Sequence, residues 1–349
     1  MSENLQNGSR WGVTAMISEP PQLVMAFVAH HLLAGADRVI VHLDTPDPAL
    51  EARLAKVPGC QVVPVTSKTW GPSRYDRPNP PSGRQRRLLE GVLEETDLDW
   101  IFHLDADEFL MSQRPISALL AEVDRSVDWL FVDVAERVHA TDPDPDNIFD
   151  GVFRRSFPPQ LDDSLSGIDG PASAFLDRGL SGYPGGKSAY RPGRGIEPDI
   201  HAPANQPVLK KGQLPDTRVL HFDGLTGAHW VWKKRRVIAQ QPAPKKLRAS
   251  IAAQRAALEA AATDAEAEAI YDQMKRLSPP RLAALQAQGR IETWDIDPRR
   301  AAWQIFGPET LDFSVAAFDP TPVPVTPYRK PSLWSRVIQG LKRRWPLRG

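Results

Sequence analysis

The chain has 349 residues, and its 43 Lys and Arg side chains balance its 43 Asp and Glu side chains, so the formal net charge is zero. Because a dedicated nucleic-acid binder normally carries a basic excess, this balance argues against a nucleic-acid partner. Cys60 is the only cysteine, which excludes an internal disulfide and a thiolate metal cluster. The amino terminus lacks an apolar signal core, and the longest charge-free run, residues 20–36, is too short to span a bilayer. We therefore expect a cytoplasmic protein.

The first 65 residues alternate strand-like and helix-like segments. Apolar runs typical of buried strands occupy residues 11–17, 38–43 and 61–65. Between them, apolar residues at helical spacing predict helices over residues 23–34 and 49–55. This alternation predicts an α/β fold with a doubly wound, mostly parallel sheet and flanking helices.

The rest of the chain adds further elements around one long irregular stretch. The remaining predicted elements are strands over residues 100–104, 129–134 and 218–222 and helices over 84–95, 116–123 and 247–277. Residues 141–218 are rich in Gly, Pro and Asp, which indicates loops with short strands at best. Residues 319–331 are Pro-rich and predict an extended linker, and residues 333–345 predict a short basic amphipathic helix.

The strongest chemical signal is the sequence Asp-Ala-Asp-Glu-Phe at residues 105–109, directly after the apolar run 100–104. Ligands bind beyond the carboxyl ends of parallel strands, and Asp105 and Asp107 lie at such an end. Two carboxylates two residues apart can converge on Mg²⁺ or Mn²⁺, which prefer oxygen ligands. The alternative interpretation is a solvated turn at the end of a strand.

Two other segments match common motifs only in part. Residues 141–147 alternate three aspartates but lack the Gly and Glu of an EF-hand loop, so we expect a solvated loop. Residues 185–188 (Gly-Gly-Lys-Ser) lack the first Gly of a P-loop, and Pro192 prevents the long helix that should follow. Lys187 and Arg191 are therefore either phosphate-binding cations or part of an exposed basic loop.

Histidines near the predicted strands offer one further ligand. His221 ends a predicted strand, as Asp105 does, and either completes an Asp/His metal site or has a structural role. His30 and His31 lie on a predicted buried helix and His103 lies in a buried strand, so we expect structural roles for these three.

Taken together, these residues resemble a bacterial glycosyltransferase family 2-like protein of the GT-A fold, from about Val13 to Lys233. The most specific match is the Asp-x-Asp-Glu-Phe sequence of residues 105–109, which follows an apolar strand as in the family. Glu19 matches the glutamate of the family's Lys-Asn-Glu turn, but Ile17 and Ser18 replace the Lys and Asn. The other matches, in chain order, are His30-His31 before Gly35, Asp44, Gln85, Lys187-Ser188, Arg191-Pro192, His201 and His221-Phe222.

The resemblance implies a combined metal and nucleotide site. It implies that Asp107 holds Mn²⁺ or Mg²⁺, that Asp105 contacts the metal or the ribose, and that His221 is a further metal ligand. The residues it implies for the nucleotide-diphosphate sugar are Glu19, Asp44, Gln85, Asp105, Lys187, Arg191 and His201. An inverting transfer also needs a carboxylate base at the acceptor hydroxyl, for which the candidates are Glu108, Asp223, Glu197 and Asp199, and we favour Asp223.

Four parts of the chain follow from the resemblance and the predicted elements. Residues 1–233 are expected to form a GT-A-like, nucleotide-sugar-binding catalytic domain, and residues 234–318 a helical extension. Residues 319–331 are the Pro-rich linker, and residues 332–349 are the basic amphipathic tail helix.

The predicted function is a metal-dependent glycosyltransferase that moves a sugar from a nucleotide-diphosphate sugar to a glycan or lipid-linked acceptor in cell-surface polysaccharide synthesis. One alternative is a metal-dependent phosphoester hydrolase that uses the same acids. Another is a degenerate, non-catalytic domain that binds a glycan or a partner, which the lost Lys-Asn turn favours.

The tail carries its own prediction. Residues 329–349 hold seven Lys and Arg and no acid, so the rest of the chain is acidic. A basic amphipathic helix of this kind predicts peripheral contact with the anionic inner face of the cytoplasmic membrane. The alternatives are a helix docked on its own domain and a free chain end.

Overall fold

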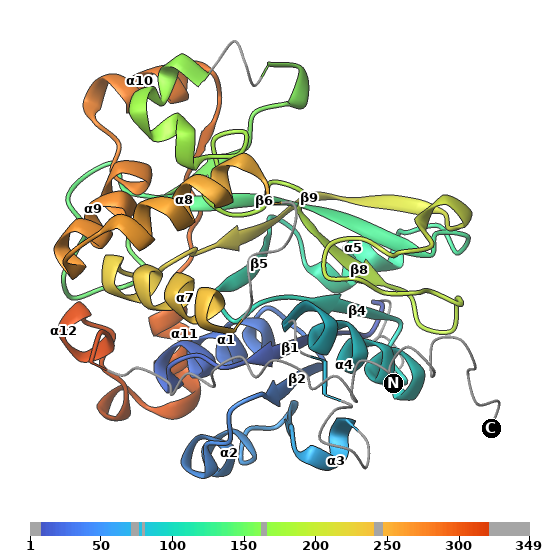
Figure 1. The fold of residues 1–349 in the computed structure, drawn as a ribbon. Helices are drawn as coiled ribbons and strands as arrows, with labels where there is room; N and C mark the ends of the chain where they lie inside the picture. Colours follow the sequence, from blue (N-terminus) through green and yellow to red (C-terminus); the bar gives the residue numbers. More distant parts are fainter. Residues whose placement is uncertain (1–7, 71–76, 79–80, 162–165, 241–246, 321–349) are drawn as a thin grey trace, which may run out of the picture.

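The structure is a computed structural model that describes residues 8–70, 77–78, 81–161, 166–240 and 247–320 (Figure 1). All but the first two residues of the predicted linker 319–331, and the whole predicted tail 332–349, lie outside the described residues. None of the helices in the described ranges combines the length and the apolar character that crossing a bilayer requires.

Four parallel strands form one half of a ten-stranded sheet, in the order β3–β2–β1–β4. Their bounds are Trp11–Ile17 (β1), Arg38–Leu43 (β2), Cys60–Pro64 (β3) and Trp100–His103 (β4). Alternate residues of β2 face opposite sides, so Val39 and Val41 pack with α1 (Pro21–Leu33), whereas Ile40 packs with α4 (Pro81–Glu95). The predicted α/β class with flanking helices is therefore confirmed.

The helices of this half begin and end at residues that suit those positions. Pro21 begins α1, where its missing N–H costs no hydrogen bond, and the chain turns after α1 at Gly35, whose φ is +94°. Asp47 caps α2 (Pro48–Leu54) by accepting a hydrogen bond of 3.0 Å from the Leu50 N–H. The short helix α3 (Ser67–Trp70) follows β3.

The other half of the sheet is largely antiparallel. Its strands are Glu108–Ser112 (β5), Trp129–Val138 (β6), Val152–Arg155 (β7), Lys187–Tyr190 (β8), Lys211–His221 (β9) and Ile291–Glu292 (β10). Strand β8 joins the halves by pairing antiparallel with both β4 and β6, and β9 pairs parallel with β6 and antiparallel with β5. Residues 141–218, expected to be mostly loop, thus contain β7, β8 and most of β9, because these short strands carry little periodicity of their own.

Helices follow the sheet in the chain. They are α7 (Gly227–Gln240), α8 (Ala249–Ala260), α9 (Asp264–Lys275), α10 (Pro279–Ala287), α11 (Pro298–Phe306) and α12 (Val315–Phe318), and α5 (Ile116–Ala121) lies between β5 and β6. Short 3₁₀ helices cover Pro159–Leu161, Ser166–Ile168, Gly170–Phe175, Gln206–Val208 and Pro308–Thr310. The prediction of one helix over residues 247–277 is wrong, because Ala261 is extended and Thr263 caps a new helix by accepting from the Glu266 N–H.

The carboxyl-terminal helices pack with the sheet as well as with one another. Helices α7, α8 and α9 lie together at the left of Figure 1. Ala302 of α11, Phe313 and Phe318 belong to the same apolar core as β1 and α1. The predicted boundary after residue 233 falls inside α7, which carries residues of the candidate active site.

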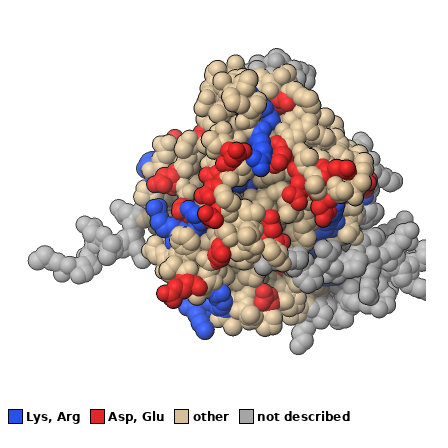
Figure 2. Space-filling view, turned by 90° about the vertical axis from the view of Figure 1, so that its left-hand side faces the viewer, with Lys and Arg blue, Asp and Glu red and all other residues tan. Residues whose placement is uncertain are grey.

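Lys and Arg are interspersed with Asp and Glu over the face shown in Figure 2.

Candidate active site

Asp105 and Asp107 lie in the turn between β4 and β5, at the carboxyl end of the parallel strands, and Glu108 begins β5. Strand β5 returns antiparallel to β9, and their register places Glu108 opposite His221. The Phe222 N–H donates to the Asp107 carbonyl oxygen at 2.8 Å, which extends this pairing beyond the strand ends. The acids from one chain segment and the histidine from another are therefore fixed by backbone pairing.

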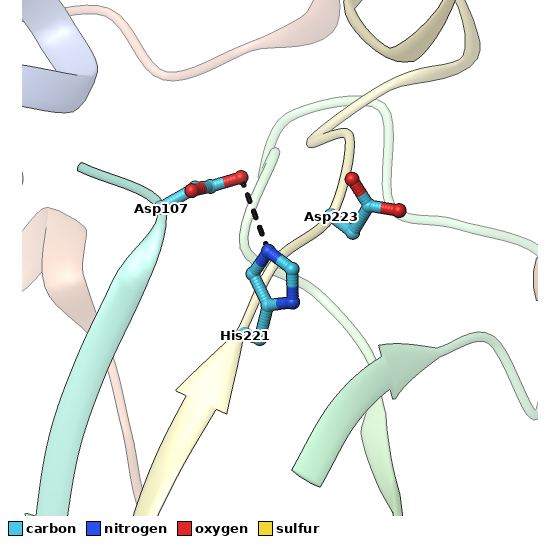
Figure 3. A group of neighbouring side chains, drawn as sticks. All are labelled: Asp107, His221 and Asp223. Carbon is cyan, nitrogen blue, oxygen red and sulfur yellow. Dashed lines mark ion pairs between the residues drawn. The ribbon is translucent and has the colours of Figure 1, made fainter. Parts of the chain in front are cut away.

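Asp107, His221 and Asp223 form a compact group of oxygen and nitrogen donors (Figure 3). Each offers one ligand atom, and these atoms lie within 4.8 Å of one another. His221 Nε2 is 3.5 Å from Asp107 Oδ2. Two carboxylates and an imidazole suit Mn²⁺ or a similar divalent cation, so this donor set fits the implied metal.

Asp105, a predicted ligand, is held apart from this group. Its Oδ1 accepts a hydrogen bond of 2.6 Å from Gln85 Nε2 of α4, and its Oδ2 lies 2.6 Å from Lys187 Nζ of β8. Of the three predicted ligands, the structure brings Asp107 and His221 together. It groups Asp223, which we expected to be the base, with them.

Lys187 and Glu108 are enclosed beneath the turn. Lys187 Nζ is 2.8 Å from Glu108 Oε2, and both side chains are about 4% exposed. Burial raises the pKa of Glu108 even though the Lys187 ammonium opposes the shift. Glu108 Oε2 also accepts a hydrogen bond of 2.8 Å from the Asp105 N–H. The structure thus places Glu108, a predicted base, under the acidic turn.

A cavity of about 220 Å³ opens beside Asp105 and Asp107, and we refer to it as the candidate cavity. Its charged lining combines carboxylates with cations: Glu19, Asp44, Arg84, Asp105, Asp107, Lys233 and Arg236. Gln85 and His221 also line it. Five predicted nucleotide-contacting or metal-binding positions beyond Asp107 therefore surround one space, although they come from distant parts of the sequence.

The cations of the candidate cavity are paired with its carboxylates. Arg84 Nη2 is 2.9 Å from Asp44 Oδ2, and Arg236 Nη2 is 2.6 Å from Glu19 Oε1. Lys233 Nζ forms an ion pair with Asp107 Oδ2. Each of these cations is therefore positioned by an ionic contact before any ligand enters.

Sequence reasoning missed the two cations of α7. Lys233 and Arg236 belong to the run His-Trp-Val-Trp-Lys-Lys-Arg-Arg at residues 229–236, which begins six residues after Asp223. The basic half of that run follows closely on the His-Phe-Asp sequence 221–223, and this proximity is the sequence signal that could have identified the two cations.

Three predicted nucleotide ligands, Lys187, Arg191 and His201, do not line the candidate cavity. The Arg191 guanidinium lies 4.2 Å from the Trp100 ring centroid, and its Nε donates to the Val127 carbonyl oxygen at 2.9 Å. Arg191 lines a different cavity beside Gly193, so the structure does not bring it to the candidate cavity. His201 lies with Nδ1 3.0 Å from the Gly186 carbonyl oxygen, and burial lowers its pKa to about 4.

Opposite charges in and beside the donor group stabilise each other's ionised forms. Burial would raise the pKa of Asp107, but Lys233 and His221 outweigh it and hold that pKa far below its usual range. Burial would lower the pKa of His221, but Asp107 reverses the shift and raises it to about 9. A metal ion bound here would displace the proton of His221 and the Lys233 ammonium from Asp107. The positive charge of the metal would then take the place of these two cations.

No protein-family model and no curated protein sequence matches this chain. Among the solved structures that resemble it are three proteins of low sequence identity. TarS of S. aureus is 12% identical, with 71% of this chain and 70% of that chain covered and a TM-score of 0.34. GalNAc-T7 with UDP, GalNAc and Mn²⁺ is 14% identical, with coverages of 69% and 53% and a TM-score of 0.37. Glucosyl-3-phosphoglycerate synthase from Mycobacterium tuberculosis, in complex with phosphoglyceric acid, is 15% identical, with coverages of 69% and 84% and a TM-score of 0.30.

All three proteins are glycosyltransferases, the class that the sequence resembles. The aligned region spans about half of the GalNAc-T7 chain. At these identities and TM-scores the likeness says nothing about the chemistry of this chain.

Proposed function

We propose that this chain is a metal-dependent glycosyltransferase that uses a nucleotide-diphosphate sugar. The observation that carries the proposal is the meeting of Asp107, His221 and Asp223 beside a cavity lined by Arg84, Lys233 and Arg236. A divalent cation held by the three donors would neutralise the leaving diphosphate as it forms.

The cations of the candidate cavity support binding of the diphosphate. Arg84 and Arg236 present planar guanidinium groups, which recognise phosphate oxygens in pairs, and Lys233 presents a compact ammonium. Their carboxylate partners, Asp44 and Glu19, hold them in place when the cavity is empty of ligand. We propose that the nucleoside lies toward Asp44, the position that the family resemblance assigns to the base and ribose.

The assignment of Asp223 changes from base to metal ligand. Asp223 Oδ2 accepts a hydrogen bond of 2.6 Å from Ser181 Oγ and lies 3.5 Å from Lys234 Nζ. Burial would raise its pKa, but Lys234 and the other nearby cations hold it well below the usual value. A carboxylate so stabilised as an anion accepts a proton poorly at neutral pH, so it suits a metal ligand better than a general base. The inverting outcome stays a prediction.

The acceptor is proposed as a glycan or a lipid-linked sugar. Contact with an anionic membrane through residues 332–349 belongs to the same proposal, and those residues lie outside the described part of the chain. Peripheral attachment would bring the candidate cavity to a lipid-linked acceptor.

Donor turnover tests the proposal. Wild type and Asp107→Asn are incubated with Mn²⁺ and a panel of nucleotide-diphosphate sugars, and the release of nucleoside diphosphate is measured. We expect release by wild type and a loss of at least about 100-fold in the variant, since a charge-bearing ligand to the metal is removed. Equal release by both proteins would contradict the metal site, and release of phosphate from simple esters without a nucleotide would indicate a hydrolase instead.

A further inference from the structure

Glu136 lies beneath the proposed metal site. It is neither one of the three proposed metal ligands nor part of the lining of the candidate cavity. It stands on β6, next to β9, and is 2% exposed. Its register partner on β9 is His221. A carboxylate buried this deeply needs compensating partners, so its contacts indicate what it does.

Both carboxylate oxygens of Glu136 accept hydrogen bonds. Oε1 accepts from Lys275 Nζ and from the Ser181 N–H, both at 2.7 Å, and Oε2 accepts from the Gly182 N–H at 2.8 Å. Lys275, at the carboxyl end of α9, is 1% exposed. The ion pair therefore links the central sheet to a helix 139 residues farther along the chain.

The remaining neighbour of Glu136 is His221. Glu136 Oε2 is 3.9 Å from His221 Nδ1, whereas the other ring nitrogen, Nε2, faces Asp107. A histidine that binds a metal through one nitrogen generally donates its other N–H to a carboxylate or carbonyl, which fixes the ring and its tautomer. Glu136 is the carboxylate that faces Nδ1, and a small shift of either side chain would bring the two from 3.9 Å into hydrogen-bonding distance.

We propose that Glu136 is the positioning residue of the metal site: it directs Nδ1–H of His221 toward itself, so that Nε2 points to the cation held with Asp107 and Asp223. Lys275 keeps Glu136 in place by supplying the opposite charge. This inference rests on the proposed metal site, and it extends that site to α9.

The segment around Ser181 shows how closely this arrangement is packed. A Cβ atom added to Gly182 would lie 3.0 Å from Glu136 Oε2 and 3.1 Å from His221 Cε1. Gln254 of α8 donates to the Ser181 carbonyl oxygen at 2.9 Å, and Ser181 Oγ donates to Asp223. The same short segment thus contacts the positioning carboxylate and one metal ligand, and a larger residue at position 182 would require Glu136 or His221 to shift.

A purely structural role for Glu136 is the competing explanation, and three variants separate the two. Glu136→Gln removes the charge while keeping the shape, and Glu136→Gln with Lys275→Met avoids leaving a buried lysine unpaired. Asp169→Asn is the matched control, because Asp169 is also a buried carboxylate, pairs with Arg154 at 2.6 Å and contacts no residue of the metal group.

Affinity for Mn²⁺ alone is measured by calorimetry, together with thermal unfolding. We expect both Glu136 variants to bind Mn²⁺ about 10–100-fold more weakly than wild type, the range found for lost outer partners of metal ligands. Asp169→Asn should lower the unfolding temperature and keep the wild-type affinity. Wild-type affinity in the folded double variant would overturn the positioning role while leaving the metal site intact. Absence of Mn²⁺ binding in wild type itself would instead overturn the proposed metal site, and this inference with it.

Discussion

Acidification should destabilise the protein through its buried histidines, and His30→Gln should remove a measurable part of that effect. His30 lies on α1, is 8% exposed, and has its Nε2 3.0 Å from the Leu110 carbonyl oxygen. Burial lowers its pKa from 6.5 to about 4. At pH 5 the folded protein therefore keeps His30 neutral, whereas the unfolded chain binds a proton there.

The size of the effect follows from the two pKa values. Because the folded pKa is the lower one, the contribution of His30 to stability is present above pH 6.5 and is lost as the pH falls from 6.5 toward 4. Between pH 7 and pH 5, a shift from 6.5 to about 4 corresponds to a loss of ~2 kcal/mol in the free energy of unfolding.

Urea unfolding at pH 7, 6 and 5 measures this loss in wild type and in His30→Gln. Between pH 7 and pH 5 the variant should lose ~2 kcal/mol less than wild type, whatever its stability at pH 7. His42→Gln is a matched second variant, because burial also lowers the pKa of His42 to about 4. Equal losses in wild type and both variants would refute the conclusion that these histidines are buried in the neutral form.

Three further predictions follow from the site. Lys187→Met should destabilise the protein by about 3–5 kcal/mol in urea unfolding, because it leaves Glu108 buried without its counter-charge; adding Glu108→Gln should recover part of the loss, and no recovery would contradict the pairing. Gly182→Ala should weaken Mn²⁺ binding in calorimetry, since its Cβ would press on Glu136 and His221, and unchanged affinity would contradict that packing. Deletion of residues 332–349 should reduce co-sedimentation with anionic vesicles and leave neutral vesicles unaffected, whereas unchanged retention would contradict membrane contact.

The sequence predicted those parts of the fold and site that depend on local pattern. The alternation of apolar runs predicted β1 to β4 and their helices, and the position of Asp105 and Asp107 after an apolar run predicted acids at a sheet edge. Local pattern also suggested that His221, which ends a predicted strand, reaches the same edge. These features repeat within a few residues, which is the range that hydrophobic periodicity covers.

The rest depends on strand register and on tertiary contacts. Asp223 joins Asp107 because β5 and β9 pair with Glu108 opposite His221, and such a register is not encoded in either strand alone. Residues 187–190 form a strand, so Arg191 lies at the opposite end of it from Lys187 and cannot share its site. The buried pair of Glu136 and Lys275 joins a strand and a helix 139 residues apart, a distance that no sequence pattern reports.

Binding of nucleoside diphosphates tests the central claim most directly. Calorimetric titration of wild type and Asp107→Asn with a panel of nucleoside diphosphates, with and without Mn²⁺, measures whether the metal group and the candidate cavity act as one site. We predict that wild type binds at least one nucleoside diphosphate tightly only with Mn²⁺, and that Asp107→Asn loses this dependence. Binding that is equally tight without the metal, or absent under every condition, would contradict the account.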